Sequence, residues 1–247
     1  MVYNNPFSLE GKTILVTGAS SGIGKSIAIA CSQMGGTIII TGRNEGRLQE
    51  TMNQLSGSGH SAISGDLTDG EARHRIASLT PALDGVVHCA GIGHTKMCKQ
   101  IEESDLQTVM GINFNAQVLL QKELQCCKKI NKKGSIVFIS SIAVTKAIVA
   151  NAIYSASKGA LTSYANCLQL ELAPRQIRVN TVHPAMVWTD LIYNSVLGEE
   201  ELKADMEKYP LKRYGNPEDV AYLVIYLLSD ASQWMTGNHI EITGGYR

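Results

Sequence analysis

Tyr154 and Lys158 are the pair of residues in this chain best suited to proton transfer. They lie four residues apart in a segment with helical spacing, so a helix would place them on one face, one turn apart. A free tyrosine, with a pKa of about 10, is a poor proton donor or acceptor at neutral pH. A neighbouring ammonium favours the phenolate and brings the pKa of the tyrosine towards the useful range. Because such pairs are also common on helix surfaces, this pair needs support from other residues.

Ser141 supplies part of that support. It lies thirteen residues before Tyr154 and ends an apolar run that is typical of a buried strand. If that strand and the helix meet at the carboxyl edge of a sheet, the serine hydroxyl reaches the same point as the phenol. The three side chains together indicate an acid–base site at that edge.

A glycine-rich turn, Thr17–Gly24, has the sequence TGASSGIG and lies between an apolar run and a helical segment. Gly18 permits a sharp turn, Gly22 leaves room for a pyrophosphate beside the backbone, and Gly24 lets the helix pack close to the strand. The free N–H groups and the positive dipole end of the helix then face the phosphates. Although glycines also occur in plain turns, this position after the first strand favours a dinucleotide site.

The residues after the second expected strand bear on which dinucleotide is bound. A carboxylate there would bond the ribose hydroxyls and repel a 2′-phosphate, whereas an arginine would attract that phosphate. The chain has Thr41-Gly42-Arg43-Asn44, with no acid. We therefore expect NADP(H) as the cofactor, with NAD(H) as the alternative and a solvated surface cation as the other interpretation of Arg43.

Apolar runs rich in valine and isoleucine alternate with helical segments along the whole chain. Such runs are typical of strands buried on both faces, as in a parallel sheet covered by helices. The alternation predicts an α/β fold with a doubly wound, seven-stranded parallel sheet, the Rossmann type. The expected strands are 12–18, 37–42, 60–66, 85–91, 135–141, 177–184 and 239–243. The expected helices are 22–34, 45–55, 69–79, 103–130, 152–173 and 217–228.

We expect a single domain over residues 1–247, because no linker, repeat or low-complexity tract interrupts the alternation. Two stretches break the rhythm. Residues 184–211 form a long connection of the kind that often covers a ligand. Residues 92–101 form a polar loop after the carboxyl end of a strand, where open α/β sheets bind their ligands.

The composition excludes several classes of protein. Lys and Arg together number 22, as do Asp and Glu, so the zero net charge gives no support to binding of nucleic acid or of an anionic membrane. No apolar run approaches the ~18–20 residues that span a bilayer. The first residues do not resemble a secretory signal, so we expect a cytoplasmic protein. The six cysteines lack a C-x-x-C pair and a nearby histidine cluster, so we expect reduced thiols and no metal site.

Taken together, these features resemble the short-chain dehydrogenase/reductase family, and within it the 3-oxoacyl-[acyl-carrier-protein] reductase-like members. The motifs keep the family's order and spacing over essentially the full length of the chain. They are the TGxxxGIG turn at Thr17–Gly24, Asp66, the Ala90-Gly91 pair, Asn113, Ser141 and Tyr154-x-x-x-Lys158.

The resemblance implies a role for each catalytic candidate. Tyr154 would be the general acid in carbonyl reduction and the base in alcohol oxidation. Lys158 would lower the pKa of Tyr154 and bind the nicotinamide ribose. Ser141 would hydrogen-bond the substrate oxygen as charge develops on it. Asn113 would hold a water molecule that links Lys158 to solvent.

The same resemblance implies that a nicotinamide dinucleotide supplies the hydride chemistry. Asp66 would accept a hydrogen bond from the adenine amino group, and Thr189 would bond the nicotinamide carboxamide. The expected cofactor contacts are Gly18, Ser20, Ser21, Gly22, Ile23, Gly24, Arg43, Asn44, Asp66, Leu67, Ala90, Gly91, Tyr154, Lys158, Pro184, Val187 and Thr189.

The substrate that the resemblance implies is a carbonyl compound or secondary alcohol, with 3-oxoacyl compounds and hydroxysteroids as the leading classes. The expected substrate wall is mostly apolar and comprises residues 93–95, 142–144 and 186–193. The polar contacts it could add are His94, Asn151 and His183, each of which could instead be structural.

Three positions depart from the family's pattern. His88-Cys89 stands where the family has two asparagines, so the amide contacts that steady the central strand need a replacement. We expect His88 to be a core histidine. Pro184-Ala185 replaces Pro-Gly, which would restrict the backbone near the nicotinamide, and Thr243 replaces an acid before two glycines.

The family resemblance also predicts a homotetramer. The apolar positions that fit either a subunit interface or an ordinary core are Leu161, Tyr164, Leu168 and Leu172. Basic residues at 128–133 and Arg175 could dock an acyl carrier protein or form a solvated helix end. Two other functions stay open: an NAD(H)-preferring alcohol dehydrogenase of the same family, and a catalytically silent nucleotide-sensing regulator.

Overall fold

The seven strands form one parallel sheet in the order β3-β2-β1-β4-β5-β6-β7, as the alternation predicts. The structure is a computed structural model and describes residues 5–193 and 198–246. Residues 194–197 of the expected 184–211 connection lie outside the described residues. The strands are β1 (Thr13–Thr17), β2 (Thr37–Gly42), β3 (Ser61–Ser64), β4 (Leu83–His88), β5 (Ile130–Ile139), β6 (Arg178–Pro184) and β7 (His239–Ile242).

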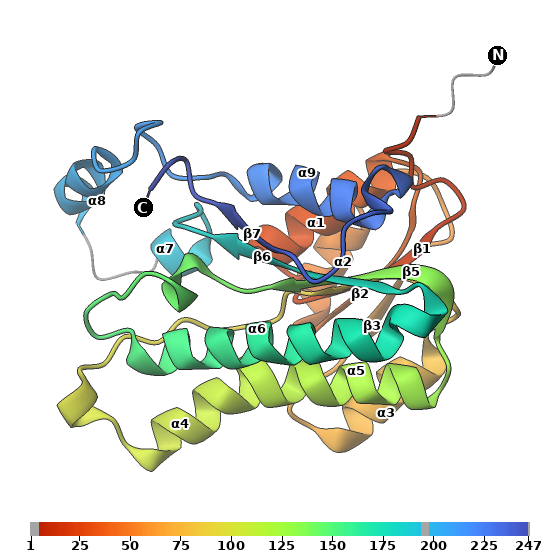
Figure 1. Cartoon of the computed structure of the whole chain (residues 1–247), viewed down its shortest axis with the longest axis horizontal. Coiled ribbons are helices and arrows are strands. Elements are labelled where there is room, and N and C mark those ends of the chain that lie inside the picture. The colour runs from red at the N-terminus through yellow and green to blue at the C-terminus, as the bar shows by residue number, and fades with distance from the viewer. Residues whose placement is uncertain (1–4, 194–197, 247) are drawn as a thin grey trace.

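Helices cover both faces of the sheet (Figure 1). One face carries α1 (Gly22–Gln33), α2 (Glu45–Met52) and α9 (Pro217–Leu228), and the other carries α3 (Gly70–Leu79), α5 (Ala116–Cys126) and α6 (Ala152–Leu172).

Successive residues of β1 explain why its sequence is apolar throughout. Ile14 and Val16 belong to the core under α1 and α9, whereas Leu15 belongs to the core under α5 and α6. Side chains alternate across a strand, so a strand covered on both sides has no polar face. The continuous apolar runs of the sequence therefore identify the strands correctly.

The expected helix 103–130 is wrong in two respects. It consists of α4 (Glu103–Met110), a π-helical turn (Gly111–Asn115) and α5, and it ends at Cys126. Ile130 instead starts β5, where it is buried and pairs with Leu83 of β4. The chain turns at Lys128, whose φ of 52° lies in the left-handed region.

Most of the apolar positions on α6 that fitted either an interface or a core belong to the core. Leu161, Leu168 and Leu172 are buried against the sheet, and Tyr164 is half-buried with its ring edge-on to Phe138. The outward face of the same helix layer exposes other apolar side chains instead, including Leu119 and Leu170.

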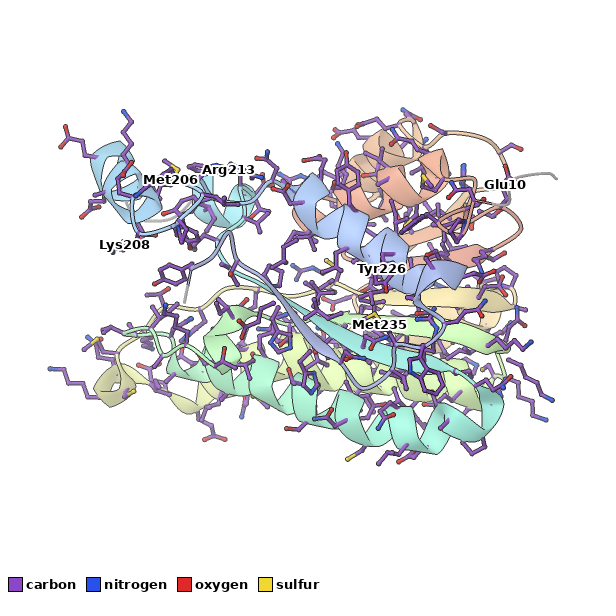
Figure 2. All side chains as sticks on the ribbon, turned by 45° about the horizontal axis from the view of Figure 1, so that its top comes forward. Glu10, Met206, Lys208, Arg213, Tyr226 and Met235 are labelled. Carbon is purple, nitrogen blue, oxygen red and sulfur yellow. The ribbon has the colours of Figure 1, made fainter. Side chains whose placement is uncertain are left out.

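The connection 184–211 contains structure that the sequence pattern does not predict. It includes α7 (Asp190–Tyr193) and α8 (Glu199–Met206), and a small separate core forms around Tyr209 and Tyr214. Tyr209 stacks on Tyr246 near the C-terminus, with ring centroids 4.6 Å apart. Figure 2 shows Met206 at the end of the molecule opposite Glu10. The connection is therefore a packed unit with its own apolar contacts.

All six cysteines are free thiols. Within residues 5–193 and 198–246, no three side chains of His, Cys, Asp or Glu gather as a metal ion would require. No helix in the described part of the chain is both long and apolar enough to cross a bilayer.

His88 is a core histidine, as predicted. Its side chain is 0% exposed, stacks on Phe138 at 4.5 Å between ring centroids, and places Nε2 3.0 Å from Oε1 of Gln121. Burial lowers the pKa of His88 from 6.5 to about 4, although the hydrogen bond to Gln121 opposes the shift. The imidazole is therefore neutral at pH 7.

Protonation of His88 should weaken the fold in acid. The unfolded chain binds the proton below pH 6.5 and the folded chain only near pH 4, so stability is lost as the pH falls through that window. We expect His88→Asn to reduce the fall in melting temperature between pH 7 and pH 5, while exposed His74→Asn leaves it unchanged. His183, whose pKa is also lowered to about 4, contributes in the same direction. Identical pH dependence in wild type and His88→Asn would show that His88 is not held neutral.

Candidate active site

The candidate catalytic residues meet at the carboxyl edge of the sheet. Ser141 follows β5, and Tyr154 and Lys158 lie in the first two turns of α6. The connection that carries α7 and α8 leaves β6 at this same edge (Figure 1). Because all seven strands are parallel, their carboxyl ends bring together residues that are distant in the sequence.

Lys158 is a buried cation, with 4% of its surface exposed. Its Nζ donates a hydrogen bond to the carbonyl of Ile139 at 2.9 Å and lies 5.9 Å from the centre of the Tyr154 ring. A side chain at Gly91 would come within 3.4 Å of Nζ, so the glycine leaves space for the ammonium. Burial lowers the pKa of Lys158 from 10.5 to about 8.

The chain's own groups raise the pKa of Tyr154. Burial is the largest cause, and an interaction with Ser141 opposes it. The ammonium of Lys158 lies beside the ring and bonds the Ile139 carbonyl. The phenol is therefore protonated at neutral pH and can act as a proton donor. The lowering of the Tyr154 pKa that the resemblance implies for the site with its cofactor stays a prediction.

Ser141 is held at the start of a 3₁₀ turn, Ile142–Val144. Its Oγ accepts a hydrogen bond from the backbone N–H of Ala143 at 3.1 Å. The same side chain lowers the pKa of Tyr154, so the serine and the phenol lie near each other.

Asn113 lies on the π-helical turn between α4 and α5 and is fully buried. Its Oδ1 accepts from Ile92 N at 2.8 Å, and its Nδ2 donates to Ile92 O at 3.0 Å and to Ser157 Oγ at 3.1 Å. All polar atoms of the side chain are thus engaged by the protein. The contact of Asn113 with a relay water stays a prediction.

The glycine-rich turn has the geometry of a phosphate cradle. A Cβ at Gly24 would lie 2.4 Å from the carbonyl oxygen of Gly18, so only glycine lets α1 start this close to β1. Gly18 has φ of 66° and would clash with the backbone of Ala90 if it had a side chain. Ser21, the N-cap of α1, makes no side-chain capping bond, and the first turn contains no acid. The residues present therefore fit a dinucleotide pyrophosphate.

A cation and an anion lie near each other where β2 and β3 end. Exposed Arg43 helps to lower the pKa of Asp66, for which hydrogen bonds from Thr68 are the larger cause. Oδ1 of Asp66 accepts from both Thr68 N and Thr68 Oγ1. Asn44 caps α2 by accepting from Arg47 N at 2.9 Å. Leu67 is buried in the core beside Asp66.

Thr189 lies over the glycine-rich turn. Its Cγ2 would be 3.1 Å from a Cβ at Gly22, and its Oγ1 donates to the carbonyl of Val187 at 3.3 Å. Next to it, Asp190 forms an ion pair with Arg47 at 3.2 Å. Arg47 is not predictable from the sequence, because a single arginine in a polar helix carries no distinguishing signal.

Thr17 and two glutamines replace the contacts of the absent asparagines. Thr17 Oγ1 accepts from the backbone N–H groups of Cys89 and Ala90 at 2.9 and 3.1 Å. Gln117 donates to Ala90 O, and Gln121 bonds His88. The two glutamines are not among the residues predicted from the sequence, although their spacing of four within an otherwise apolar helix face is a signal that identifies such a pair.

The change from Pro-Gly to Pro184-Ala185 introduces no strain. Ala185 is not among the residues with positive φ, and its N–H bonds the carbonyl of Ile242 at 3.1 Å. Ala185 therefore restricts the backbone without forcing it into a conformation that requires glycine.

Two of the three polar candidates for substrate contact have side-chain partners in the protein. His183 is 2% exposed and bonds Thr181, so it is a structural histidine. His94 lies 3.2 Å from a carboxylate oxygen of Asp105. Asn151 precedes α6, where its backbone carbonyl accepts from the N–H of Ser155 and its side chain makes no capping hydrogen bond.

The basic residues near Arg175 lie at the opposite edge of the sheet. Arg175 donates to the carbonyl of Ile130, so the two helix–strand junctions do meet, as expected. Ile130 is the first residue of β5 and Ser141 follows its last, so the whole strand separates this basic group from the catalytic candidates of the same chain.

Comparisons with known proteins agree on the class of enzyme. A family model described as enoyl-(acyl carrier protein) reductase matches residues 18–247. The 3-oxoacyl-[acyl-carrier-protein] reductase of Rickettsia conorii is 36% identical over 239 residues, covering 96% of this chain and 97% of the relative. This chain belongs to the short-chain dehydrogenase/reductase family. It is an oxidoreductase that uses a nicotinamide cofactor and acts on CH–OH or carbonyl groups.

Solved structures of other short-chain dehydrogenases/reductases have the same fold. A dehydrogenase/reductase from Sinorhizobium meliloti 1021 has a TM-score of 0.90 at 32% identity, covering 98% of this chain and 97% of that one. A structure described as an NAD(P)-dependent gluconate 5-dehydrogenase from Beutenbergia cavernae, with NADP bound at low occupancy, has a TM-score of 0.89 at 28% identity. The alignment of the two structures covers 98% of this chain and 99% of the Beutenbergia chain.

We expect Lys158→Met to raise the melting temperature of this short-chain dehydrogenase/reductase at pH 7. Between pH 8 and pH 10.5 the unfolded chain binds a proton that the folded chain has lost, so wild-type stability rises with pH in that window. Below pH 8 the buried charge makes the wild type less stable than Lys158→Met by roughly 2 kcal/mol. This figure allows for the hydrogen bond to Ile139 that the variant loses.

Thermal unfolding from pH 7 to pH 10 measures this effect. The gap between the two proteins should narrow as the pH rises, and exposed Lys99→Met should show no such trend. A variant that is less stable than wild type at every pH would refute the buried-cation interpretation.

Proposed function

We propose that this enzyme transfers a hydride between NADP(H) and a carbonyl or secondary alcohol, with Tyr154 as the general acid and base. The observation that carries the proposal is the convergence of Tyr154, Ser141 and Lys158 at the carboxyl edge of the sheet. A protonated phenol that is hydrogen-bonded to a serine hydroxyl is arranged to donate to an oxygen that becomes negative.

The bound dinucleotide supplies the hydride. In reduction, Ser141 and Tyr154 hold the substrate oxygen by hydrogen bonds, and Tyr154 gives its proton to that oxygen. Lys158 then faces the phenolate, where its positive charge stabilises the new negative charge in a site with little water. In oxidation the same phenolate accepts the proton.

The cofactor contacts extend from the glycine-rich turn to the cover. The turn and the N-terminus of α1 would hold the pyrophosphate, and Arg43 would face the 2′-phosphate of NADP(H). Asp66 and Leu67 would lie at the adenine, and Pro184, Val187 and Thr189 at the nicotinamide. The absence of an acid after β2 and the NADP in the gluconate 5-dehydrogenase structure support NADP(H) over NAD(H).

For the substrate we propose a 3-oxoacyl thioester. The name of the Rickettsia relative and the apolar residues 142–144 support this class. Hydroxysteroids and sugar acids are the competing classes, the latter because of the gluconate 5-dehydrogenase. The family model's description adds the double bond of an enoyl thioester as a further substrate to test.

The connection 184–211 is proposed to cover the substrate. Its described residues pack as a unit around Tyr209 and Tyr214, and Trp188 contacts the Tyr214 ring at 5.1 Å between centroids. A cover with its own apolar core can move as one body over the site, while residues 5–183 of the domain keep their place.

A homotetramer and docking of an acyl carrier protein are proposed from the same resemblance. Exposed Leu119 and Leu170 on the outer helix layer support an interface between copies. The basic group around Arg175 lies at the far edge of the sheet, so a carrier protein docked there would serve the site of a neighbouring subunit. The cytoplasmic location stays an expectation from the sequence.

An absorbance screen at the reduced-nicotinamide band tests the proposed function. We expect wild type to oxidise NADPH with a 3-oxoacyl thioester, and Tyr154→Phe to lower kcat at least about 10³-fold because the proton donor is lost. Tyr164→Phe removes a hydroxyl from the same helix, where the ring packs on Phe114 and Phe138, and should keep full activity.

Undiminished turnover by Tyr154→Phe would refute the mechanism. Binding of NADPH without oxidation across acyl, enoyl, steroid and sugar substrates would favour the nucleotide-sensing alternative. Activity with only one of these classes of compound would identify the substrate class.

Replacement of Arg43 tests the cofactor preference. We expect Arg43→Asp to weaken NADPH binding about tenfold or more, since one charge-assisted contact to the 2′-phosphate becomes repulsive, and to change NADH binding less than about threefold. Fluorescence of Trp188 reports binding, and Lys132→Asp at the far edge gives the same change in net charge. Equal losses of affinity for NADPH and NADH would show that Arg43 does not contact the 2′-phosphate.

A further inference from the structure

Gln117 is a fully buried polar residue in the first turns of α5. Its Nε2 donates two hydrogen bonds, to the carbonyl of Ala90 at 2.6 Å and to the carbonyl of Asn113 at 2.9 Å. Both partners are acceptors, so the orientation of the amide is fixed. One side chain thus ties the helix to the segment that follows β4.

The bond to Asn113 lies within an irregular part of the helix. In the π-helical turn Gly111–Asn115 the hydrogen bonds span five residues, as from Ala116 N to Gly111 O. Such turns are rare and occur mainly as isolated interruptions of α-helices, frequently at functional sites. The amide of Gln117 gives the carbonyl of Asn113 a donor inside this widened turn.

From Asn113 the hydrogen bonds continue to the catalytic helix. Asn113 Nδ2 donates to Ser157 Oγ at 3.1 Å, and Ser157 Oγ donates to the carbonyl of Tyr154 at 2.7 Å. Ser157 lies between Tyr154 and Lys158 on α6. Gln117 therefore begins a chain of hydrogen bonds that ends on the backbone of the proton donor.

A second branch reaches the site through the loop after β4. Gln117 fixes Ala90, and Asn113 fixes both the N–H and the C=O of Ile92. Gly91, between them, is the residue that leaves space for the Lys158 ammonium. Both neighbours of the site, α6 and this loop, thus depend on the same π-helical turn.

Stability alone does not explain a glutamine at this position. Its Oε1 is buried and has no hydrogen-bond partner within the described parts of the chain, which costs about 1–3 kcal/mol, and Nε2 of Gln121 is buried and unpartnered in the same way. Gln121, one turn further along α5, is equally buried but bonds His88 and not a residue of the site. The difference between the two glutamines is what they position.

We propose that Gln117 is a positioning residue for the reaction, because it holds the π-helical turn and the Ala90 carbonyl so that Asn113, Gly91 and Lys158 keep their places. This inference rests on the proposed function, in which Tyr154 and Lys158 act on the substrate.

Gln117→Met and Gln121→Met form a matched pair for the test. Each replaces a buried amide by an apolar side chain of similar length, so both should lower the melting temperature by similar amounts. We expect Gln117→Met to lower kcat at least about tenfold, since small misplacements of catalytic groups have effects of this size. The substrate KM should change less than about threefold, and Gln121→Met should keep kcat within about twofold.

Two further readouts separate positioning from loss of stability. The pH profile of kcat should shift in Gln117→Met but not in Gln121→Met, because Lys158 changes place relative to the titratable groups that face it, which are Tyr154, Cys89 and His183. NADPH affinity should fall at least about fivefold in Gln117→Met only. Equal effects of the two substitutions on kcat and on NADPH affinity would overturn the proposal.

Ser157→Ala tests the route of the effect. If Gln117 acts through Asn113 and Ser157, the double variant Gln117→Met/Ser157→Ala should lose no more kcat than the more damaged single variant. Additive losses of kcat would show that Gln117 acts only through its hydrogen bond to Ala90.

Wild-type protein that binds NADPH but reduces no carbonyl compound would refute the proposed function. The NADPH affinities would then still decide whether Gln117 positions the site.

Discussion

The burial of the Lys158 ammonium is the constraint on which the rest of the site depends. A cation removed from water destabilises the fold unless neighbouring groups compensate, and here the carbonyl of Ile139 is its hydrogen-bond acceptor. Loss of solvent lowers the pKa of Lys158 and raises the pKa of Tyr154, so both groups resist carrying a charge. The proposed catalytic pair therefore shares a desolvated environment, which the packing of the surrounding elements creates.

The surroundings of Lys158 are arranged around that charge. Gly91 has no side chain where the ammonium lies, and Asn113 satisfies the backbone of Ile92 next to it. A π-helical turn in the long helix places Asn113 there. A regular helix with 3.6 residues per turn would rotate the residues on one side of it by about 100° relative to the other. The irregularity is thus part of the site.

The glycine-rich turn and the connection 184–211 pack on two different cores. The turn requires the close approach of Gly24 to the Gly18 carbonyl, and α1, which begins there, packs in the large core. The connection packs on a small aromatic core that includes Tyr209 and Tyr214. Thr189, from the connection, lies beside Gly22 of the turn. The proposed cover therefore contacts the proposed cofactor turn directly.

The sequence by itself determined the sheet, the glycine-rich turn and the identity of the catalytic candidates. These features depend on local rules: alternating side chains in strands covered on both faces, and glycine where a Cβ cannot fit. His88 also belongs here, because a histidine within an apolar strand has few alternatives to burial.

Only the tertiary structure decided the features that depend on distant groups. The pKa of Tyr154 rises because several elements exclude water from it, and no pattern near residue 154 records that loss. The end of the long helix at Cys126 depends on the pairing of Ile130 with β4, and the roles of Gln117 and Gln121 depend on where β4 ends. Spacing along the chain specifies which face a residue occupies; the free energy of its surroundings is set by the elements that pack against that face.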